Sequence, residues 1–196
     1  MKLPRAVDDA IDNLTRLPGI GERSAQRLVF WLIGRPDDQI KRLSNAIVNL
    51  SEGVKVCSVC GNISEDDPCE ICSNEDREDN LLCIVEEATD MLTIEKSGAF
   101  QGQYHVLGGA IDPINDIHPE DLNIQSLIDR VGKGNFREII LATDPNAEGN
   151  ITATYLRQKL KPFGVKISRI AQGISYGSGI SYANERSLKE AFSNRI

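Results

Sequence analysis

The chain has 196 residues, 40% of them hydrophobic, and a formal net charge of −7 at pH 7. This length allows one large or two small domains with a real core, and no apolar run approaches the roughly 18 residues of a membrane-spanning helix. Residues 1–56 hold nine basic and seven acidic residues, residues 57–90 one and eleven, and residues 91–196 twelve and eleven. The net charge therefore does not exclude a polyanionic partner, because the acidity belongs to one segment.

Helical periodicity dominates the N-terminal region. Apolar residues recur at helical spacing in three stretches, which predicts helices over residues 5–17, 22–33 and 37–51. Gly34, Arg35 and Pro36 end the second of these helices and separate it from the third.

The turn between the first two predicted helices carries a candidate binding site. Gly19 and Gly21 bracket the apolar Ile20, which predicts a tight hairpin with unhindered amides and a helix that begins at once. The first N–H groups of that helix suit a phosphate, and Arg23 and Arg27, one turn apart, extend the same surface. A plain helical hairpin is the alternative. Together with Pro18 and Ala25, the two arginines make the turn resemble the helix-hairpin-helix motif of DNA-binding proteins. The backbone contacts of that motif are insensitive to DNA sequence.

Two cysteine pairs follow the third predicted helix. Cys57 and Cys60 form one pair and Cys69 and Cys72 the other, a spacing that predicts a tetrahedral, all-sulfur shell for one structural Zn²⁺ per chain. Two disulfides would require an oxidising compartment, but the N-terminal residues lead into an acidic amphipathic stretch rather than an apolar export signal. A closed site leaves no position for a substrate, so the predicted zinc stabilises the fold and does not catalyse.

After the cysteines, short apolar runs alternate with helical stretches. This alternation predicts an α/β fold with a parallel sheet and crossover helices. The predicted strands are 81–86, 104–108, 138–143 and 166–171, and the predicted helices are 88–97, 121–131 and 147–161. Cys83 lies inside the first strand, where it is predicted to be a buried core thiol rather than a metal ligand.

Acidic residues close two of the predicted strands. Glu86 ends the first, whereas Asp144 ends the third and is followed by Asn146 and Glu148. In parallel sheets, binding and catalytic residues lie at the carboxyl ends of the strands. The pattern of acidic residues resembles the toprim domain, which holds Mg²⁺ with a strand-terminal Glu and an Asp-x-Asp-x-Glu loop. Here Asn146 replaces the middle carboxylate, which weakens attraction for a hard cation. A catalytic Mg²⁺ site and an occasional weak Mg²⁺ site at Glu86, Asp144 and Glu148 stay open, and the sequence favours helix capping or plain solvation.

These elements, in this order, resemble one family over essentially the whole chain: the bacterial recombination mediator RecR. Further matching segments are residues 104–113, 156–166 and 169–173. The resemblance implies four parts, namely a helix-hairpin-helix region (1–53), a four-cysteine zinc finger (54–77), a toprim domain (78–173) and a C-terminal oligomerisation segment (174–196). Two positions depart from the family pattern, with Gln172 in place of a common His and Asn184 in place of the Asp in Tyr-Ala-Asp. The chain also lacks a Walker A loop, which argues against ATP hydrolysis.

The resemblance implies a function without catalysis. Members of this family form ring-like tetramers, joined through their helix-hairpin-helix regions at one interface and their C-terminal segments at another. With RecO and RecF they help load recombinase onto gapped DNA. For this chain it implies sequence-independent binding of double-stranded and gapped DNA, a homotetramer, a cytoplasmic, nucleoid-associated location and no membrane partner.

Two other classes of protein remain open on the sequence. A toprim nuclease or topoisomerase-like enzyme would need an intact acidic triad, against which Asn146 argues. A zinc-dependent interaction protein would need no DNA role. The acidic cysteine region is either a solvated face, which the sequence favours, or a docking face for a basic partner.

Overall fold

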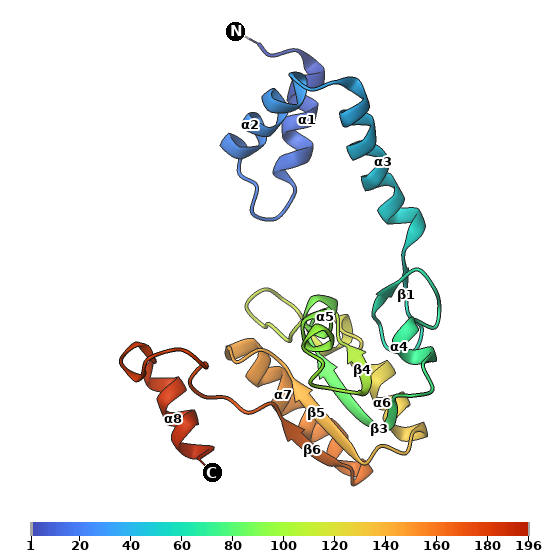
Figure 1. Ribbon diagram of the computed structural model, residues 1–196, viewed down its shortest axis with the longest axis vertical. Coiled ribbons are helices and arrows are strands. Elements are labelled where there is room, and N and C mark those ends of the chain that lie inside the picture. Colours follow the sequence, from blue (N-terminus) through green and yellow to red (C-terminus); the bar gives the residue numbers. More distant parts are fainter. Residues whose placement is uncertain (1, 196) are drawn as a thin grey trace. The chain divides into compact units, whose positions relative to one another are not determined.

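The computed structural model describes residues 2–195, which divide into two compact units with the boundary between Val54 and Lys55 (Figure 1). Helices α1 to α3 belong to the first unit, and the strands described belong to the second. No helix among these residues is long and apolar enough to cross a membrane. The α/β composition that the sequence predicts is confirmed.

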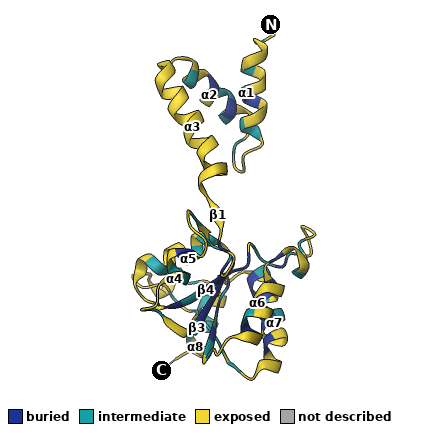
Figure 2. Ribbon diagram, turned by 90° about the vertical axis from the view of Figure 1, so that its right-hand side faces the viewer, coloured by how far each residue is buried: buried dark blue, intermediate teal, exposed yellow. Residues whose placement is uncertain are grey.

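The N-terminal unit consists of three helices, α1 (Arg5–Thr15), α2 (Glu22–Ile33) and α3 (Asp37–Gly53). Its small core lies between α1 and α2, where Ile11, Ala25 and Val29 are buried (dark blue in Figure 2). Helix α1 is two residues shorter than predicted, because residues 16–19 form turns of the hairpin. Helix α3 buries none of its residues, so its apolar side faces no partner within this unit.

The cysteine segment, residues 54–77, follows α3. It contains a two-stranded antiparallel ladder and one short helix: β1 (Lys55–Val56), β2 (Ile63–Ser64) and α4 (Glu70–Ser73). The sequence does not predict these elements, since two-residue strands are too short to show a periodic pattern.

A four-stranded parallel sheet forms the centre of the second unit, in the order β4-β3-β5-β6. Its strands are β3 (Glu78–Val85), β4 (Gly102–Val106), β5 (Glu138–Ala142) and β6 (Lys166–Arg169). All four strands were predicted, with shifted ends. Strand β3 begins within the polar tract, because Glu78 already pairs with Gly102 across a register shift.

Helices cover both faces of this sheet, namely α5 (Ala88–Ser97), α6 (Ile124–Lys133) and α7 (Ala147–Leu160). Side chains alternate along β3, so that Leu82 and Ile84 join the core with α6 and α7, whereas Cys83 and Val85 join the core beneath α5. Helix α6 begins three residues later than predicted, because Pro119–Asp121 forms a separate 3₁₀ turn.

The C-terminal segment after β6 buries little of its surface. It contains a 3₁₀ turn, Ile180–Tyr182, and helix α8, Glu185–Ser193, neither of which the sequence predicts. Neither element contains a buried residue. Tyr176 and Phe192 are exposed large apolar side chains.

Candidate functional site

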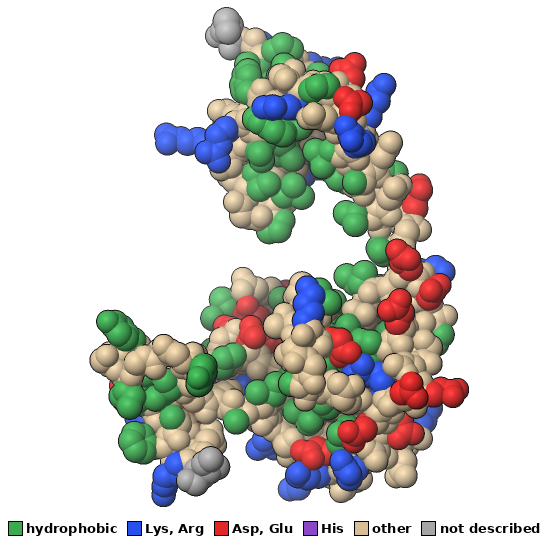
Figure 3. All heavy atoms as spheres, viewed as in Figure 1, with side chains coloured by type: hydrophobic (Ala, Val, Ile, Leu, Met, Phe, Trp, Pro, Cys, Tyr) green, Lys and Arg blue, Asp and Glu red, His purple; other side chains and the backbone are tan. Residues whose placement is uncertain are grey.

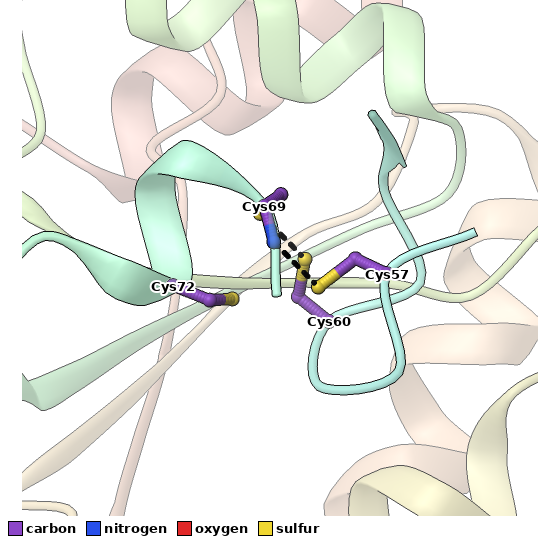
Figure 4. A group of neighbouring side chains, drawn as sticks. All are labelled: Cys57, Cys60, Cys69 and Cys72. Carbon is purple, nitrogen blue, oxygen red and sulfur yellow. Dashed lines mark hydrogen bonds between the residues drawn. The ribbon is translucent and has the colours of Figure 1, made fainter. Parts of the chain in front are cut away.

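Four sulfur atoms converge in the cysteine segment (Figure 4). The Sγ atoms of Cys57, Cys60, Cys69 and Cys72 all lie within 4.8 Å of one another, and those of Cys60 and Cys69 are 3.6 Å apart. Tetrahedral Zn²⁺ with bonds of about 2.3 Å places its sulfur ligands about 3.8 Å apart. The four thiols therefore fit one zinc ion, and the prediction of a four-cysteine zinc site is confirmed.

Backbone amides support the sulfurs. The N–H of Cys69 donates to Sγ of Cys57 at 3.3 Å, and the N–H of Asn62 donates to Sγ of Cys60 at 3.5 Å. The pKa of Cys60 is lowered to about 5, chiefly because the thiol of Cys72 hydrogen-bonds to its sulfur, whereas burial raises the pKa of the Cys69 thiol. Thiolates are the form that binds zinc, and three of the four cysteines are buried. The arrangement is a closed structural site with no open coordination position.

The cysteine segment is joined firmly to the sheet. The N–H of Val106 in β4 donates to the carbonyl of Cys60 at 2.7 Å. Arg77, at the end of the segment, forms a two-pronged ion pair with Glu95 of α5 at 2.6 and 3.0 Å. Ile71 of α4 contacts both the sulfur cluster and the core beneath α5. Zinc therefore stabilises one face of the sheet as well as the segment itself.

Cys83 lies apart from the metal ligands. It is 2% exposed in the core beneath α5, and burial raises the pKa of its thiol to about 12. The prediction of a buried core thiol is confirmed.

The hairpin between α1 and α2 has the geometry that the glycines predict. Gly19 adopts a φ of +79°, a conformation that favours glycine, and the N–H of Ile20 donates to the carbonyl of Leu17 at 3.1 Å. Ile20 is half-buried against the small core of the unit. Gly21 is the N-cap of α2, and no side chain among the described residues caps this helix. The first amides of α2 are therefore free to bind an anion.

Arg23 and Arg27 lie exposed on α2, directly after the hairpin. Arg16, at the C-cap of α1, is a third exposed arginine next to the hairpin, which sequence reasoning missed although its position just before the turn is a usable signal. Within residues 2–195 none of these three arginines forms an ion pair, whereas Arg5 pairs with Asp9. The arginines at the hairpin are therefore available to phosphates.

The strand-terminal carboxylates are held differently from one another. Glu86, directly after β3, is 7% exposed, and its Oε1 accepts the N–H of Asp144 at 3.0 Å. Burial raises the pKa of the Glu86 carboxyl. Gly149 packs closely here, since a Cβ at this position would lie 2.7 Å from Oε1 of Glu86. Asp144 itself is exposed. The buried glutamate thus serves as a hydrogen-bond acceptor that shapes the loop.

The amide that replaces the middle carboxylate caps α7. Oδ1 of Asn146 accepts the N–H of Gly149 at 2.7 Å, which confirms the capping interpretation for this residue. The positively charged side chain of Arg169 also lies at this loop. Its guanidinium donates to Oδ1 of Asn150 at 2.5 Å and to the carbonyl of Asp144 at 3.2 Å. No sequence pattern indicates that Arg169, at the end of β6, reaches this loop.

Glu86, Asp144 and Glu148 all lie at the carboxyl edge of the sheet, as predicted. In the described part of the chain, however, only the four cysteines form a group of Cys, His, Asp and Glu side chains close enough together to hold a metal ion. Weak Mg²⁺ binding at the three carboxylates stays an open alternative that the sequence does not favour.

A hollow of about 470 Å³ lies beside this loop. Asp144, Gln172 and Asn184 all line it, together with Arg186 and Glu190 of α8. The structure thus brings together the loop and the two positions that depart from the family pattern, although they lie far apart in the sequence.

Comparisons with protein families match three parts of the chain. Residues 7–50 match the helix-hairpin-helix of RecR, residues 54–74 match its four-cysteine zinc finger domain, and residues 80–171 match the Toprim domain. Fold and site together define a recombination protein with a DNA-binding helix-hairpin-helix motif and a structural zinc.

Similar proteins cover almost the full chain. The chain is 48% identical over 190 residues to the recombination protein RecR of Thermobifida fusca, spanning 97% of this chain and 96% of that one. It is 46% identical to RecR of Acidothermus cellulolyticus over 96% and 95% of the two chains, and 44% identical to RecR of Tropheryma whipplei over 97% and 96%. The chain belongs to the RecR family of recombination proteins.

Proposed function

We propose that the chain acts as a non-catalytic DNA clamp in recombinational repair, binding double-stranded and gapped DNA without regard to sequence. The observation that carries this proposal is the hairpin, where Gly19 and Gly21 precede a helix without a side-chain cap and the exposed Arg23 and Arg27 form no ion pair in the described chain. Free amides and unpaired guanidinium groups bind phosphates, which every DNA sequence offers.

The loop after β5 supports the absence of catalysis. Metal-dependent phosphoryl transfer needs carboxylates that hold its cation. Here Asn146 supplies an amide engaged in capping, Glu86 is committed to the N–H of Asp144, and the guanidinium of Arg169 adds a positive charge. These contacts favour a loop held by protein groups alone.

A ring-like homotetramer belongs to the proposal, as the family resemblance implies. Two surfaces support it. Helix α3 exposes large apolar side chains, including Ile47 and Leu50, and the C-terminal segment, residues 174–196, exposes Tyr182 and Phe192. Apolar surfaces of this kind mark protein interfaces. Several copies acting together also multiply phosphate contacts and hence affinity.

The remaining parts of the proposal rest on the resemblance to the family. They are the partners RecO and RecF, the domain limits 1–53, 54–77, 78–173 and 174–196, and a cytoplasmic location at the nucleoid, where bacterial chromosomal DNA lies. The hairpin residues Gly19, Ile20 and Gly21 are proposed as DNA contacts together with the two arginines.

Binding and nicking assays on one zinc-loaded sample test the proposal. We expect similar affinity for two duplexes of unrelated sequence and for a gapped duplex, falling with salt, and intact supercoiled DNA after incubation with Mg²⁺. Failure to bind any of these DNAs would favour an interaction protein without a DNA role. Mg²⁺-dependent nicking that Asp144→Ala abolishes would favour a toprim enzyme.

A further inference from the structure

A groove lies between the cysteine segment and helix α5, far along the chain from the hairpin. It has a volume of about 410 Å³ and is lined by residues of β2, α4 and α5 and the loop between β2 and α4. Its apolar floor consists of Ile63, Ile71, Met91 and Leu92. One zinc ligand, Cys69, is among its lining residues, but none of the proposed DNA contacts is.

The floor of the groove contains both buried and exposed apolar side chains. Met91 is 4% exposed and belongs to the core beneath α5, against which Ile71 packs. Ile63 and Leu92 are 59% and 48% exposed. Large aliphatic side chains held open to solvent beside a packed core are typical of a binding surface.

The rim of the groove is acidic. Glu65, Asp66 and Glu70 line it and are exposed, and no Lys or Arg is among its described lining residues. Arg77 does not neutralise them, because its buried guanidinium is already paired with Glu95. Asp and Glu side chains gather over this part of the molecule in Figure 3.

Hydrogen bonds within the chain tie the walls of the groove together. Oδ1 of Asp67 accepts both the N–H and the hydroxyl of Ser58 at 2.8 Å, which ties the two cysteine pairs together. The zinc ligands, together with the hydrogen bond from the N–H of Val106 to the carbonyl of Cys60, hold the same segment against β4. A preformed groove costs less ordering entropy on binding than a flexible one.

We propose that this groove docks a basic, amphipathic segment of a partner protein, one that presents Lys or Arg beside Leu, Ile or Phe. The acidic rim selects the cations and the floor of Ile63 and Leu92 takes the apolar side chains. DNA is excluded, because its phosphates would meet the carboxylates of the rim. The surface does not depend on the proposed DNA role, since it shares no residue with the hairpin.

A synthetic peptide tests this docking surface. The probe is a fluorescein-labelled helical peptide of about 15 residues, with Leu at i and i+4 and Lys on the flanking positions. Its binding to the zinc-loaded full chain is measured by fluorescence anisotropy. We expect Leu92→Ser and the double variant Glu65→Lys/Asp66→Lys each to weaken binding at least about tenfold, a loss of about 1.4 kcal/mol.

Two controls separate the groove from the general charge of the segment. Glu75→Lys/Asp76→Lys makes the same charge change in the same segment outside the groove, and we expect it to weaken binding much less. In methyl NMR spectra, signals of Ile63, Ile71 and Leu92 should shift with peptide. A signal from the core, such as that of Ile139, should not.

Several results would overturn the proposal. These are equal losses in the two charge-reversal variants, full binding by Leu92→Ser, or floor methyl signals that stay in place. A fall in the solution mass of the free protein with Leu92→Ser would assign the groove to a second copy of this chain instead. If Glu65→Lys/Asp66→Lys lost its zinc, Leu92→Ser would still decide the matter, because Leu92 lies on α5 outside the cysteine segment.

Discussion

Asn146 is the residue at which the enzyme and clamp interpretations differ most. Its side-chain oxygen caps α7, and an aspartate keeps that acceptor while adding a charge that the helix N-terminus stabilises by roughly 0.3–1 kcal/mol. We therefore expect Asn146→Asp to fold at least as stably as the wild type and to bind Mg²⁺ more tightly.

Isothermal titration with Mg²⁺ checks this expectation, with Asn13→Asp, on the exposed face of α1, as a control for added charge. Equal Mg²⁺ affinity in wild type and Asn146→Asp would show that the missing carboxylate is not what weakens the site.

Gly149 allows the loop after β5 to approach Glu86. A Cβ at this position would lie 2.1 Å from the carbonyl oxygen of Asp144, so backbone as well as side chain would have to move. We expect Gly149→Ala to lower the free energy of unfolding by about 1–3 kcal/mol. Each kcal/mol lowers Tm by roughly 2–4 °C for a chain of this length.

Thermal unfolding measures the effect of this change. Gly53→Ala is the matched control, because nothing lies within 4 Å of a Cβ there and the position ends helix α3. A Gly149→Ala protein that unfolds at the wild-type temperature would contradict the close approach.

The zinc site acts at the scale of elements, since it holds β1, β2 and α4 together and against β4. Structural zinc contributes on the order of 10–16 kcal/mol of apparent binding free energy in isolated small sites. We expect Cys57→Ser to lose the metal and to lower Tm strongly. Cys83→Ala, which removes a buried thiol outside the site, should keep one zinc per chain.

Metal analysis and thermal unfolding on the same samples check this prediction. A Cys57→Ser protein that retains one zinc per chain and unfolds at the wild-type temperature would contradict this prediction.

The elements also show what sequence patterns can and cannot predict. The four strands and the three crossover helices were predictable because apolar runs and helical spacing extend over several residues. The β1–β2 ladder was not predictable from periodicity, since the cysteines of the metal site, two of which lie between β1 and β2, fix this part of the fold. Helix α8 was missed although Leu188, Ala191 and Phe192 recur at helical spacing in its sequence, a local signal that could have predicted it.

The candidate sites follow the same rule. Cysteine spacing and paired glycines are local signals and predicted the zinc site and the hairpin turn. The contact between Arg169 and Asp144 joins positions 25 residues apart in sequence, which the pairing of β5 with β6 brings together. No local sequence pattern predicts this contact. The groove beside α5 likewise exists only in three dimensions.

For the whole molecule, the exposed apolar side of α3 predicts association between copies. Ile47 is 59% exposed on a helix without buried residues. We expect the wild type to have a solution mass about four times its 21.6 kDa, and Ile47→Glu to lower that mass.

Light scattering coupled to gel filtration measures these masses. Asn45→Glu places the same charge at a polar, exposed position of α3 and should leave the assembly intact. A monomeric wild type, or equal masses for both variants, would contradict a ring joined through this helix.

We expect the hairpin to bind DNA through the phosphates of the DNA, and the salt dependence of binding tests this most directly. The logarithm of the binding constant is measured against that of salt concentration for wild type, Arg23→Ala/Arg27→Ala and the control Arg5→Ala, whose guanidinium pairs with Asp9. We predict weaker binding by the double variant on two unrelated duplexes, and a slope reduced by about 0.9 for each phosphate that the variant no longer neutralises. Wild-type affinity and an unchanged slope in the double variant would contradict this claim.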